Sequence, residues 1–499
     1  MVSPILLIAV PLILAFSVPL WGLIHKKLEK FVPLIAFGFN TYLIFRLLPF
    51  ALTERTISVV IANIKPPFGI NLAVGPFGLF FALIIQLVAL ATAFYLLSYD
   101  PPEPSDKFYM LFILLVLGST GMVLTGDIFN LFVFLEITSI SAYALTAITK
   151  TGPAAEAGFK YLLLGSLGST LVLLGIALIY GSLGTLNMAH IAHRISGMDS
   201  RLVVAAAILF IVGFGVEAEM LPLNGWVPDA YQAAPIPVVA LLSGAVAKAG
   251  LYALARVLYT LIGMPNIIML LLTFGILTMF AGELAALRQN DIRRLLAYSS
   301  IGQMGMIMLA FGAFGVNSVF GGVLQAFTHG ITKALLFLVL GVMALHTGGA
   351  TDMESLRGFG RKFPYWSMLF AVGVLSTLGL PPFAGFWSKL ALIIGVIIDG
   401  HPTYAALALI ATFIEVFYFA RLLSVIYSSK LSPKLVERSI RNTTIPLLSA
   451  TFLAAIIIAV GLYPNVFFDL GDSASRALLN RAHYIFSIIG HYLQSMGGV

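Results

Sequence analysis

Charged side chains interrupt several long apolar segments of this chain. Glu136, Lys248 and Lys333 each lie near the middle of a different predicted membrane helix, at similar depth. A charge at mid-bilayer costs roughly 2.5–3.5 kcal/mol on the insertion scale, so such residues normally face a polar interior and serve a function. Acids and bases that alternate along a row can pass protons, because each change of charge alters the protonation of its neighbour. The pattern predicts a polar row that runs sideways through the protein.

Other ionisable residues of the spans are interpreted one by one. His329 precedes Lys333 by four residues, so the two share one helix face. A neutral imidazole both accepts and donates a proton, which suits a relay. The other interpretation of His329 is a hydrogen-bonded packing residue. Lys389 is a further base within a span, whereas Glu283 and Arg421 lie near span ends, where a long side chain can extend to the interface.

The composition places these residues in a membrane. Of 499 residues, 60% are hydrophobic and 10% charged, whereas soluble domains carry roughly 25% charged residues. The chain contains no cysteine, which excludes thiolate-ligated clusters, Cys-based zinc sites and disulfides. We therefore expect no cofactor and no metal in this chain. The net charge of +7 follows from basic loops and does not indicate a nucleic-acid partner.

Apolar runs of about 20 residues, long enough to cross a bilayer as helix, recur from end to end. They predict an all-α polytopic membrane protein with about 14 transmembrane helices and short connections. The connection 53–75 predicts a small surface hairpin, and the amphipathic tail near 484–493 is expected on the membrane surface or against a partner. The predicted spans are about 2–24, 31–52, 76–99, 108–125, 128–149, 159–181, 203–223, 237–262, 264–287, 297–313, 316–346, 364–398, 403–427 and 444–465.

Two of these spans are interrupted. Prolines break the chain between spans 7 and 8, and the motif LPPFAGFW (380–387) breaks span 12. Frayed backbone at membrane depth persists only where protein or water satisfies it. Because the breaks are five spans apart, we predict two related halves, spans 4–8 and 9–13. The alternative is a pair of ordinary proline kinks. The chain then divides into residues 1–107, 108–262, 263–427 and 428–499.

Lysine and arginine are concentrated in alternate loops. The loops that follow odd-numbered spans carry a large excess of them over the loops that follow even-numbered spans. Basic loops are retained in the cytoplasm. We therefore predict a multi-pass protein of the cell membrane with both termini outside the cytoplasm.

Five stretches together resemble a known family. The chain is similar to the antiporter-like proton-conducting subunits of respiratory complex I, of Mrp-type Na⁺/H⁺ antiporters and of membrane-bound hydrogenases, and most similar to the D-subunit branch of the Mrp antiporters. The similarity spans about residues 75–430. The stretches are GDIFNLFVFLEITSISAYALTA (126–147), WVPDAYQAAPIPVVALLSGAVAKAGLYAL (226–254), NDIRRLLAYSSIGQMGMI (290–307), HGITKALLF (329–337) and LPPFAGFWSKLALI (380–393).

The resemblance implies a fold of fourteen helices with two inverted five-helix repeats, broken helices at spans 7 and 12, and a central hydrophilic axis. It assigns Glu136 to the glutamate of span 5 and Lys248 to the lysine of the central relay. His329 and Lys333 match the polar pair of span 11, and Lys389 matches the span 12 lysine toward the exit. The secondary candidates are Glu219, Glu415 and Asp229.

Glu217 is where the sequence departs from the family, which usually has a lysine there. The departure predicts a Glu136–Glu217 pair, in which one carboxyl holds a proton or both share a cation. Glu219 lies about 200° around the helix from Glu217, so both cannot face one row unless the helix is unwound. We expect Glu217 on the row and Glu219 in a second environment such as a subunit contact. The competing prediction pairs Glu219 with Lys248.

The function predicted from these residues is H⁺ or Na⁺ translocation by an antiporter-like subunit of a multisubunit membrane complex. Redox chemistry on partner subunits, or Na⁺/H⁺ exchange, would drive it. We predict no catalytic centre in this chain, and place iron–sulfur or nickel–iron centres on peripheral redox subunits. The expected partners are other membrane subunits and the lipid bilayer. The alternatives are a self-contained cation/proton secondary transporter and a structural subunit with an inactive ion path.

Overall fold

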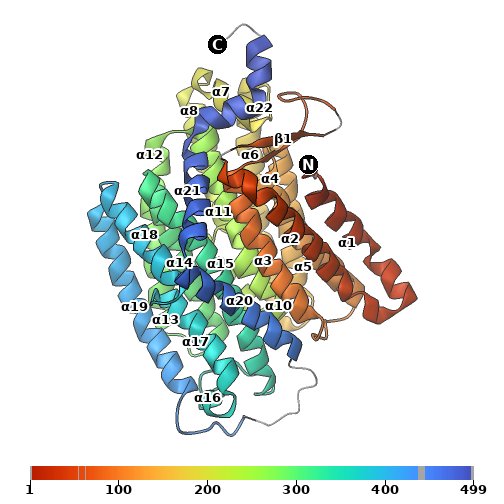
Figure 1. Cartoon of the computed structure of the whole chain (residues 1–499), viewed down its shortest axis with the longest axis vertical. Coiled ribbons are helices and arrows are strands. Elements are labelled where there is room, and N and C mark those ends of the chain that lie inside the picture. Colours follow the sequence, from red (N-terminus) through yellow and green to blue (C-terminus); the bar gives the residue numbers. More distant parts are fainter. Residues whose placement is uncertain (1–2, 54, 62, 436–443, 496–499) are drawn as a thin grey trace.

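The protein is a bundle of long apolar helices (Figure 1). The computed structural model describes residues 3–53, 55–61, 63–435 and 444–495. Within these residues, thirteen helices are long and apolar enough to cross a membrane. Two shorter apolar helices, 364–378 and 384–398, cover the predicted twelfth span. The all-α polytopic class is confirmed.

The elements follow one another with short connections. Short 3₁₀ segments occupy Lys26–Leu28 and Ile195–Gly197, and π-helical segments occupy Leu242–Val246 and Val257–Ile262. The remaining elements are α1 (Leu6–Ile24), α2 (Phe31–Leu52), β1 (Ile57–Val60), β2 (Asn71–Val74), α3 (Pro76–Leu96), α4 (Ser105–Leu124), α5 (Ile128–Ala147), α6 (Gly152–Leu183), α7 (Met188–Arg194), α8 (Ser200–Glu217), α9 (Val227–Ala233), α10 (Ile236–Leu241), α11 (Ala247–Arg256), α12 (Pro265–Ile268), α13 (Leu270–Leu287), α14 (Ile292–Gly312), α15 (Val316–Leu345), α16 (Phe359–Lys362), α17 (Pro364–Leu378), α18 (Ala384–Ile398), α19 (Pro402–Ile426), α20 (Thr444–Leu462), α21 (Asn465–Leu479) and α22 (Arg481–Ser495).

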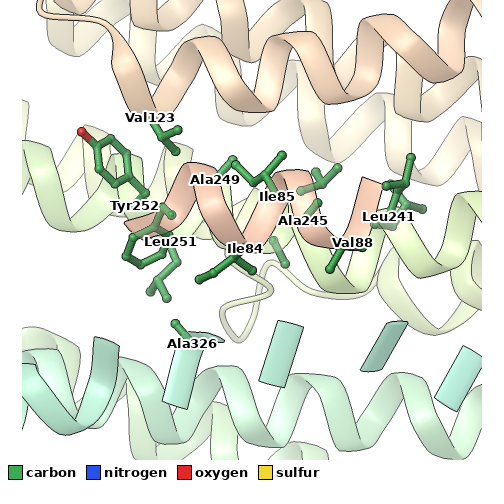
Figure 2. Packing of buried hydrophobic residues seen from close by; sticks show 14 of the residues in the cluster. Ile84, Ile85, Val88, Val123, Leu241, Ala245, Ala249, Leu251, Tyr252 and Ala326 are labelled. Carbon is green, nitrogen blue, oxygen red and sulfur yellow. The ribbon is translucent and has the colours of Figure 1, made fainter. Parts of the chain in front are cut away.

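The core lies around α3, the span 236–262, α14 and α15, which are buried along nearly their whole length. Peripheral helices such as α1 and α19 are mostly exposed. A helix that is apolar all round must be buried in a bundle or in lipid. Figure 2 shows Ile85 and Val88 of α3 packed against the small residues Ala245 and Ala249 of the span 236–262. Small side chains let these backbones approach closely.

Both predicted helix breaks are present. The backbone leaves helix after Glu217 and resumes at Val227, and it leaves α17 at Leu378 and resumes at Ala384. Protein groups satisfy the freed backbone. The Trp226 indole donates to the carbonyl of the residue before Glu217 at 3.2 Å, and Ser376 Oγ accepts from an amide of α18 at 3.3 Å.

The span 236–262 is not a regular α-helix along its whole length. It alternates α-helix with the two π-helical segments, which flank α11. A π-bulge leaves backbone carbonyls free of their usual partners and is frequent at functional sites. Lys248 lies just after the first π-helical segment.

The predicted hairpin is present, because β1 pairs antiparallel with β2. Its surface position is confirmed only in part, since β1 is partly exposed whereas β2 is buried. The tail forms two helices, α21 and α22. One face of α22 packs on α7 and β1 of the same chain, and the position of its other face at the membrane surface or against a partner stays a prediction. The Tyr492 ring meets His190 and Phe68 edge-on, with centroids 5.6 and 5.8 Å apart. Aromatic contacts of this geometry explain the docking.

Candidate functional site

The break after α8 holds Glu217 in a polar pocket. Its side chain is buried, and its two oxygens accept hydrogen bonds from Ser139 Oγ at 2.9 Å and Tyr161 OH at 3.0 Å. A Cβ added at Gly250 would lie 2.7 Å from Glu217 Cβ. Glycine is therefore required where α11 passes the end of α8. This packing brings Glu217 beside the helix that carries Lys248.

Glu219 lies on the other side of the same break and is fully buried. Its backbone is left-handed, with φ of +60°, a conformation that costs a non-glycine residue about 1 kcal/mol or more. Oε1 accepts a 2.5 Å hydrogen bond from Tyr231 OH, whereas Oε2 has no partner among the described residues. Strained backbone of this kind clusters at functional sites.

The unwound backbone settles which way Glu219 faces. The charges of Lys248 and Lys333 both act on its carboxylate. The expected subunit contact for Glu219 is therefore wrong, because the residue points inward. The competing prediction, in which Glu219 and Lys248 interact, agrees with this geometry. The two are not in direct ion-pair contact, since Lys248 Nζ donates to Ser243 O at 2.6 Å.

His329 lies on α15, which packs against the span 236–262. The side chain is buried, and neither ring nitrogen has a hydrogen-bond partner among the described residues. A Cβ added at the neighbouring Gly330 would lie 3.7 Å from Lys248 Cε. Buried polar atoms that lack protein partners usually bind water. The unpartnered imidazole lies one turn before Lys333 on α15, and the span that carries Lys248 packs beside it.

Lys333 is held from α14. Its Nζ donates to Ser299 Oγ at 2.7 Å and to Leu296 O at 3.3 Å, and the residue is fully buried. No carboxylate of the described residues forms an ion pair with Lys333. The charges of Glu283 and Glu415 nevertheless act on it. The charge of Glu219 acts on Lys333 as well, so Lys333 feels carboxylates from both halves of the chain.

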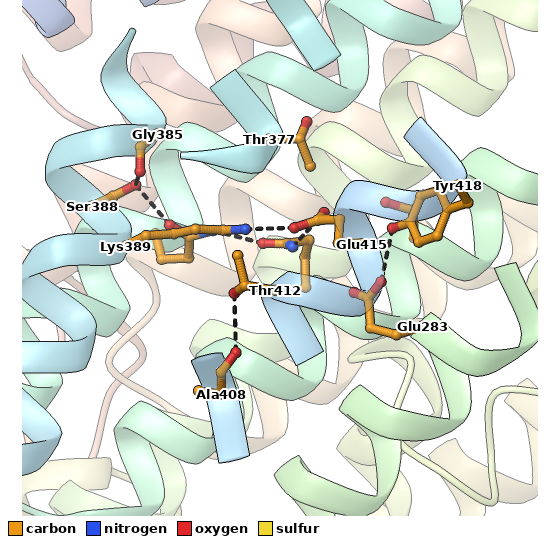
Figure 3. Close-up of polar contacts among 12 residues, drawn as sticks. Glu283, Thr377, Gly385, Ser388, Lys389, Ala408, Thr412, Glu415 and Tyr418 are labelled. Carbon is orange, nitrogen blue, oxygen red and sulfur yellow. Dashed lines mark hydrogen bonds and ion pairs between the residues drawn. The ribbon is translucent and has the colours of Figure 1, made fainter. Parts of the chain in front are cut away.

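The second half ends in a buried ion pair (Figure 3). Lys389 Nζ lies 2.5 Å from Glu415 Oε2, with side-chain exposures of 8% and 0%. Gln303 Nε2 donates to Glu415 Oε1 at 2.8 Å, Gln325 Nε2 donates to Gln303, and Ser388 donates to Gln325. A buried pair requires such further hydrogen bonds, because desolvation of two charges is costly.

Glu283 belongs to the same region, although the sequence indicated an interfacial position. It is buried, and Tyr418 OH donates to its Oε2 at 2.8 Å (Figure 3). Its Oε1 has no partner among the described residues and lies against Gly302, where an added Cβ would be 2.2 Å away. The expectation that Glu283 extends to the interface is therefore wrong. The distance of Glu283 from the end of its span in the sequence did not distinguish a buried side chain from one that extends to the interface.

Two predicted residues lie away from this row. Glu136 on α5 is half-buried and forms no hydrogen bond or ion pair with any described residue. Its charge reaches Glu217, but Ser139 and Tyr161 occupy the Glu217 oxygens, so the predicted carboxyl pair is not in direct contact. Asp229 lies nearer the surface, on α9.

Asp229 joins α9 to two other helices. Its oxygens lie 2.7 Å from Lys160 Nζ and 2.7 Å from Arg294 Nη1. Partial burial disfavours the charged carboxylate, but the two ion pairs outweigh burial and hold the pKa of Asp229 below its usual value. Cavities of about 370 Å³ and about 210 Å³ lie on either side of it. The larger is lined by Glu156 and Gln232, and the smaller by Arg294 and Tyr298.

Sequence reasoning missed the uncharged members of the row. Tyr161, Tyr231, Gln303 and Gln325 all bond row carboxylates or one another. Polar residues facing inward from membrane helices are a usable signal. Their partners, however, come from distant parts of the chain, so only the packed structure identifies them.

The fold and the buried line of acids and bases define a class, the antiporter-like membrane subunits. The family model described as "NADH:quinone oxidoreductase/Mrp antiporter, TM" matches residues 125–415. The chain belongs to this family.

Three comparisons show its relatives. A chain in the structure of the membrane-bound sulfane sulfur reductase, an archaeal respiratory membrane complex, is 42% identical, with a TM-score of 0.90 over 97% of this chain and 99% of that one. The N subunit of the NADH-quinone oxidoreductase of Desulforudis audaxviator is 34% identical over 72% of this chain and 74% of that protein. The D subunit of the Na⁺/H⁺ antiporter of Alkalihalophilus pseudofirmus is 30% identical over 86% and 87%. The chain is an antiporter-like subunit of the kind found in multisubunit membrane complexes.

Proposed function

We propose that this chain moves protons across the cell membrane along its buried row, within a larger complex. The observation that carries the proposal is the succession of Glu219, Lys248, His329, Lys333 and the Lys389–Glu415 pair. Each lies within electrostatic or hydrogen-bonding range of the next, and all are buried. Charges this deep in a membrane protein mark ion pathways.

Proton movement along the row follows from charge coupling. A proton that leaves Lys248 removes a positive charge beside Glu219 and lowers the repulsion felt by Lys333. The unpartnered nitrogens of His329 let ordered water carry the proton between the two lysines. On the other side of Lys333, its charge is coupled to the charges of Glu283 and Glu415. The lysines thus exchange protons in a coupled order.

The cavities beside Asp229 are the proposed place of proton uptake. They open on the face of the molecule that carries the first residues of α6 and α14 and lies opposite the hairpin. We assign this face to the cytoplasm. The smaller cavity is also lined by Gly282, next to Glu283. Water in the smaller cavity would therefore reach Gly282, the residue that directly precedes the buried Glu283. Both termini then lie outside the cytoplasm.

Protons suit the second half of the row better than Na⁺ does, because the lysine ammonium groups there repel a metal cation. Na⁺ is a second candidate for the first half only. There, Glu217, Ser139 and Tyr161 supply oxygen atoms alone, and hard cations prefer oxygen ligands.

Other membrane subunits complete the proposed assembly. Glu136 lies half-exposed on an α5 face that also exposes Val133 and Ile140. A carboxylate at this depth is costly in lipid, so we infer that a neighbouring subunit covers it. The energy would come from redox centres on partner subunits or from Na⁺/H⁺ exchange.

The test is to purify the complex from native membranes through a tag on this chain and identify its subunits by mass spectrometry. After reconstitution in liposomes, dyes record internal pH and Na⁺ for the wild type and for Lys333→Ala. Proton movement that Lys333→Ala abolishes would support the proposal. Iron–sulfur subunits would indicate redox drive, and small membrane subunits alone would indicate Na⁺/H⁺ exchange. A wild-type complex that moves no cation would overturn it.

A further inference from the structure

Arg256 is a buried base that the row does not use. It ends α11, about 12 Å beyond Lys248 along the helix axis, and is 4% exposed. From there the chain continues through Val257–Ile262 to the face that carries α7, the hairpin and α22, at the top of Figure 1. Arg256 therefore lies between Lys248 and that face along the span 236–262.

An aromatic cage surrounds the Arg256 guanidinium. Its centre lies 5.3 Å from the Phe77 ring, 5.4 Å from Tyr252 and 4.9 Å from Tyr484. Nε donates to Tyr252 OH at 3.1 Å and Nη1 to Thr260 Oγ1 at 3.4 Å. The flat faces of aromatic rings attract a cation without neutralising it.

The positive charge has no ionised partner. Among the described residues, no carboxylate lies within ion-pair distance of Arg256. Asp127 is an acid whose charge reaches Tyr484, but its carboxylate is engaged in capping α5, where it accepts from the amides of Phe129 and Asn130. A guanidinium stays protonated in proteins. The cage thus holds a permanent, uncompensated positive charge.

We propose that Arg256 is a fixed electrostatic barrier that prevents cations at Lys248 from leaving directly toward the α22 face. Fixed positive charges exclude protons and cations from other membrane passages in the same way. Because this way out is closed, charge at Lys248 can move on only through His329 to the second half. The inference rests on the proposed proton pathway.

The alternative is that Arg256 has a purely structural role and anchors α22 through the ring of Tyr484. That helix has another anchor, because Arg481 donates to the carbonyls of Ala192 and Leu261. The Tyr484 hydroxyl has no partner among the described residues, so its contribution at the cage is its ring. Charge and anchoring can therefore be separated by substitution.

The experiment measures passive proton leak into liposomes that contain the purified complex. A potassium diffusion potential, negative inside, drives protons inward, and a pH dye records them. Arg256→Gln, which removes the charge, is expected to raise the leak at least ten-fold over wild type. Arg256→Lys, which keeps the charge, and Tyr484→Ala, which removes the ring, are expected to stay within two-fold. Equal leak in Arg256→Gln and wild type would overturn the barrier, as would a large leak in Tyr484→Ala.

A further variant excludes a leak caused by misfolding. In Arg256→Gln/Lys248→Leu the leak should return to the wild-type level, because the barrier variant leaks only by way of Lys248. A leak that persists in the double variant would contradict the inference. Failure of the proposed function is recognised separately, since the wild-type complex would then show no driven proton movement under any condition.

Discussion

At the scale of the residue, two neighbouring glutamates have different surroundings. Glu219 is the acid that faces Lys248, whereas Ser139 and Tyr161 hold Glu217. We predict that Glu219→Gln lowers proton translocation at least ten-fold, because Lys248 loses its counter-charge. Glu217→Gln should lower it by about two- to three-fold, since a glutamine oxygen still accepts one of the two hydrogen bonds. Initial rates in proteoliposomes measure both, and wild-type rates in Glu219→Gln would remove that residue from the mechanism.

Glu283 is the second prediction at this scale. Glu283→Gln keeps an acceptor for Tyr418 and should assemble normally, yet it removes an acid that acts on Lys333. We expect translocation to fall about ten-fold with an unchanged amount of complex on native gels. The exposed Glu354→Gln, paired only within its own turn with Arg357, is the control. Loss of complex in Glu283→Gln would instead indicate a structural role.

At the scale of the element, the break between α17 and α18 positions Lys389. Gly379 has φ of +79°, and an added Cβ would lie 2.9 Å from Lys389 Cδ. Gly379→Ala is expected to destabilise the protein by about 1–2 kcal/mol, because alanine is strained in the left-handed region of backbone conformation. The added methyl group is also expected to displace Lys389 from Glu415.

Gly400 offers a matched control for that element. Its φ is +93°, but an added Cβ would meet nothing within 4 Å. Gly400→Ala should therefore show the same backbone cost without loss of translocation. Thermal unfolding and transport rates of the two variants separate the effects. Equal transport in both would mean that the break does not position Lys389.

At the scale of the whole molecule, Asp229 joins the two predicted halves, because Lys160 lies on α6 and Arg294 on α14. Its lowered folded-state pKa stabilises the protein above the unfolded pKa of about 3.9, and this stabilisation is lost as pH falls through the folded value. Asp229 is only partly buried, so solvent screening limits the contribution to about 0.5–1 kcal/mol.

We predict that Asp229→Asn lowers the thermal midpoint by a constant amount between pH 5 and 7, and that the difference shrinks below about pH 4. Scanning fluorimetry of the purified complex across this range measures it. A difference that is independent of pH down to the lowest value would show that the carboxylate charge is not its cause.

The apolar runs predicted the membrane class and the spans, and the depths of Lys248 and Lys333 predicted two buried bases of the row, whereas the similar depth of Glu136 did not bring it into the row. Hydrophobic length and the cost of a buried charge act locally along the chain, so a sequence displays them directly. Two helix breaks were also predictable, since proline removes a backbone donor wherever it stands.

Tertiary structure alone decided which groups meet. Glu219 turns toward Lys248 because its backbone takes a left-handed conformation at the break, and Glu283 is covered by Tyr418 of a distant helix. The α22 helix docks on its own chain and places Tyr484 over Arg256. These contacts join residues far apart in sequence, and their energies depend on burial and distance, which exist only once the helices have packed.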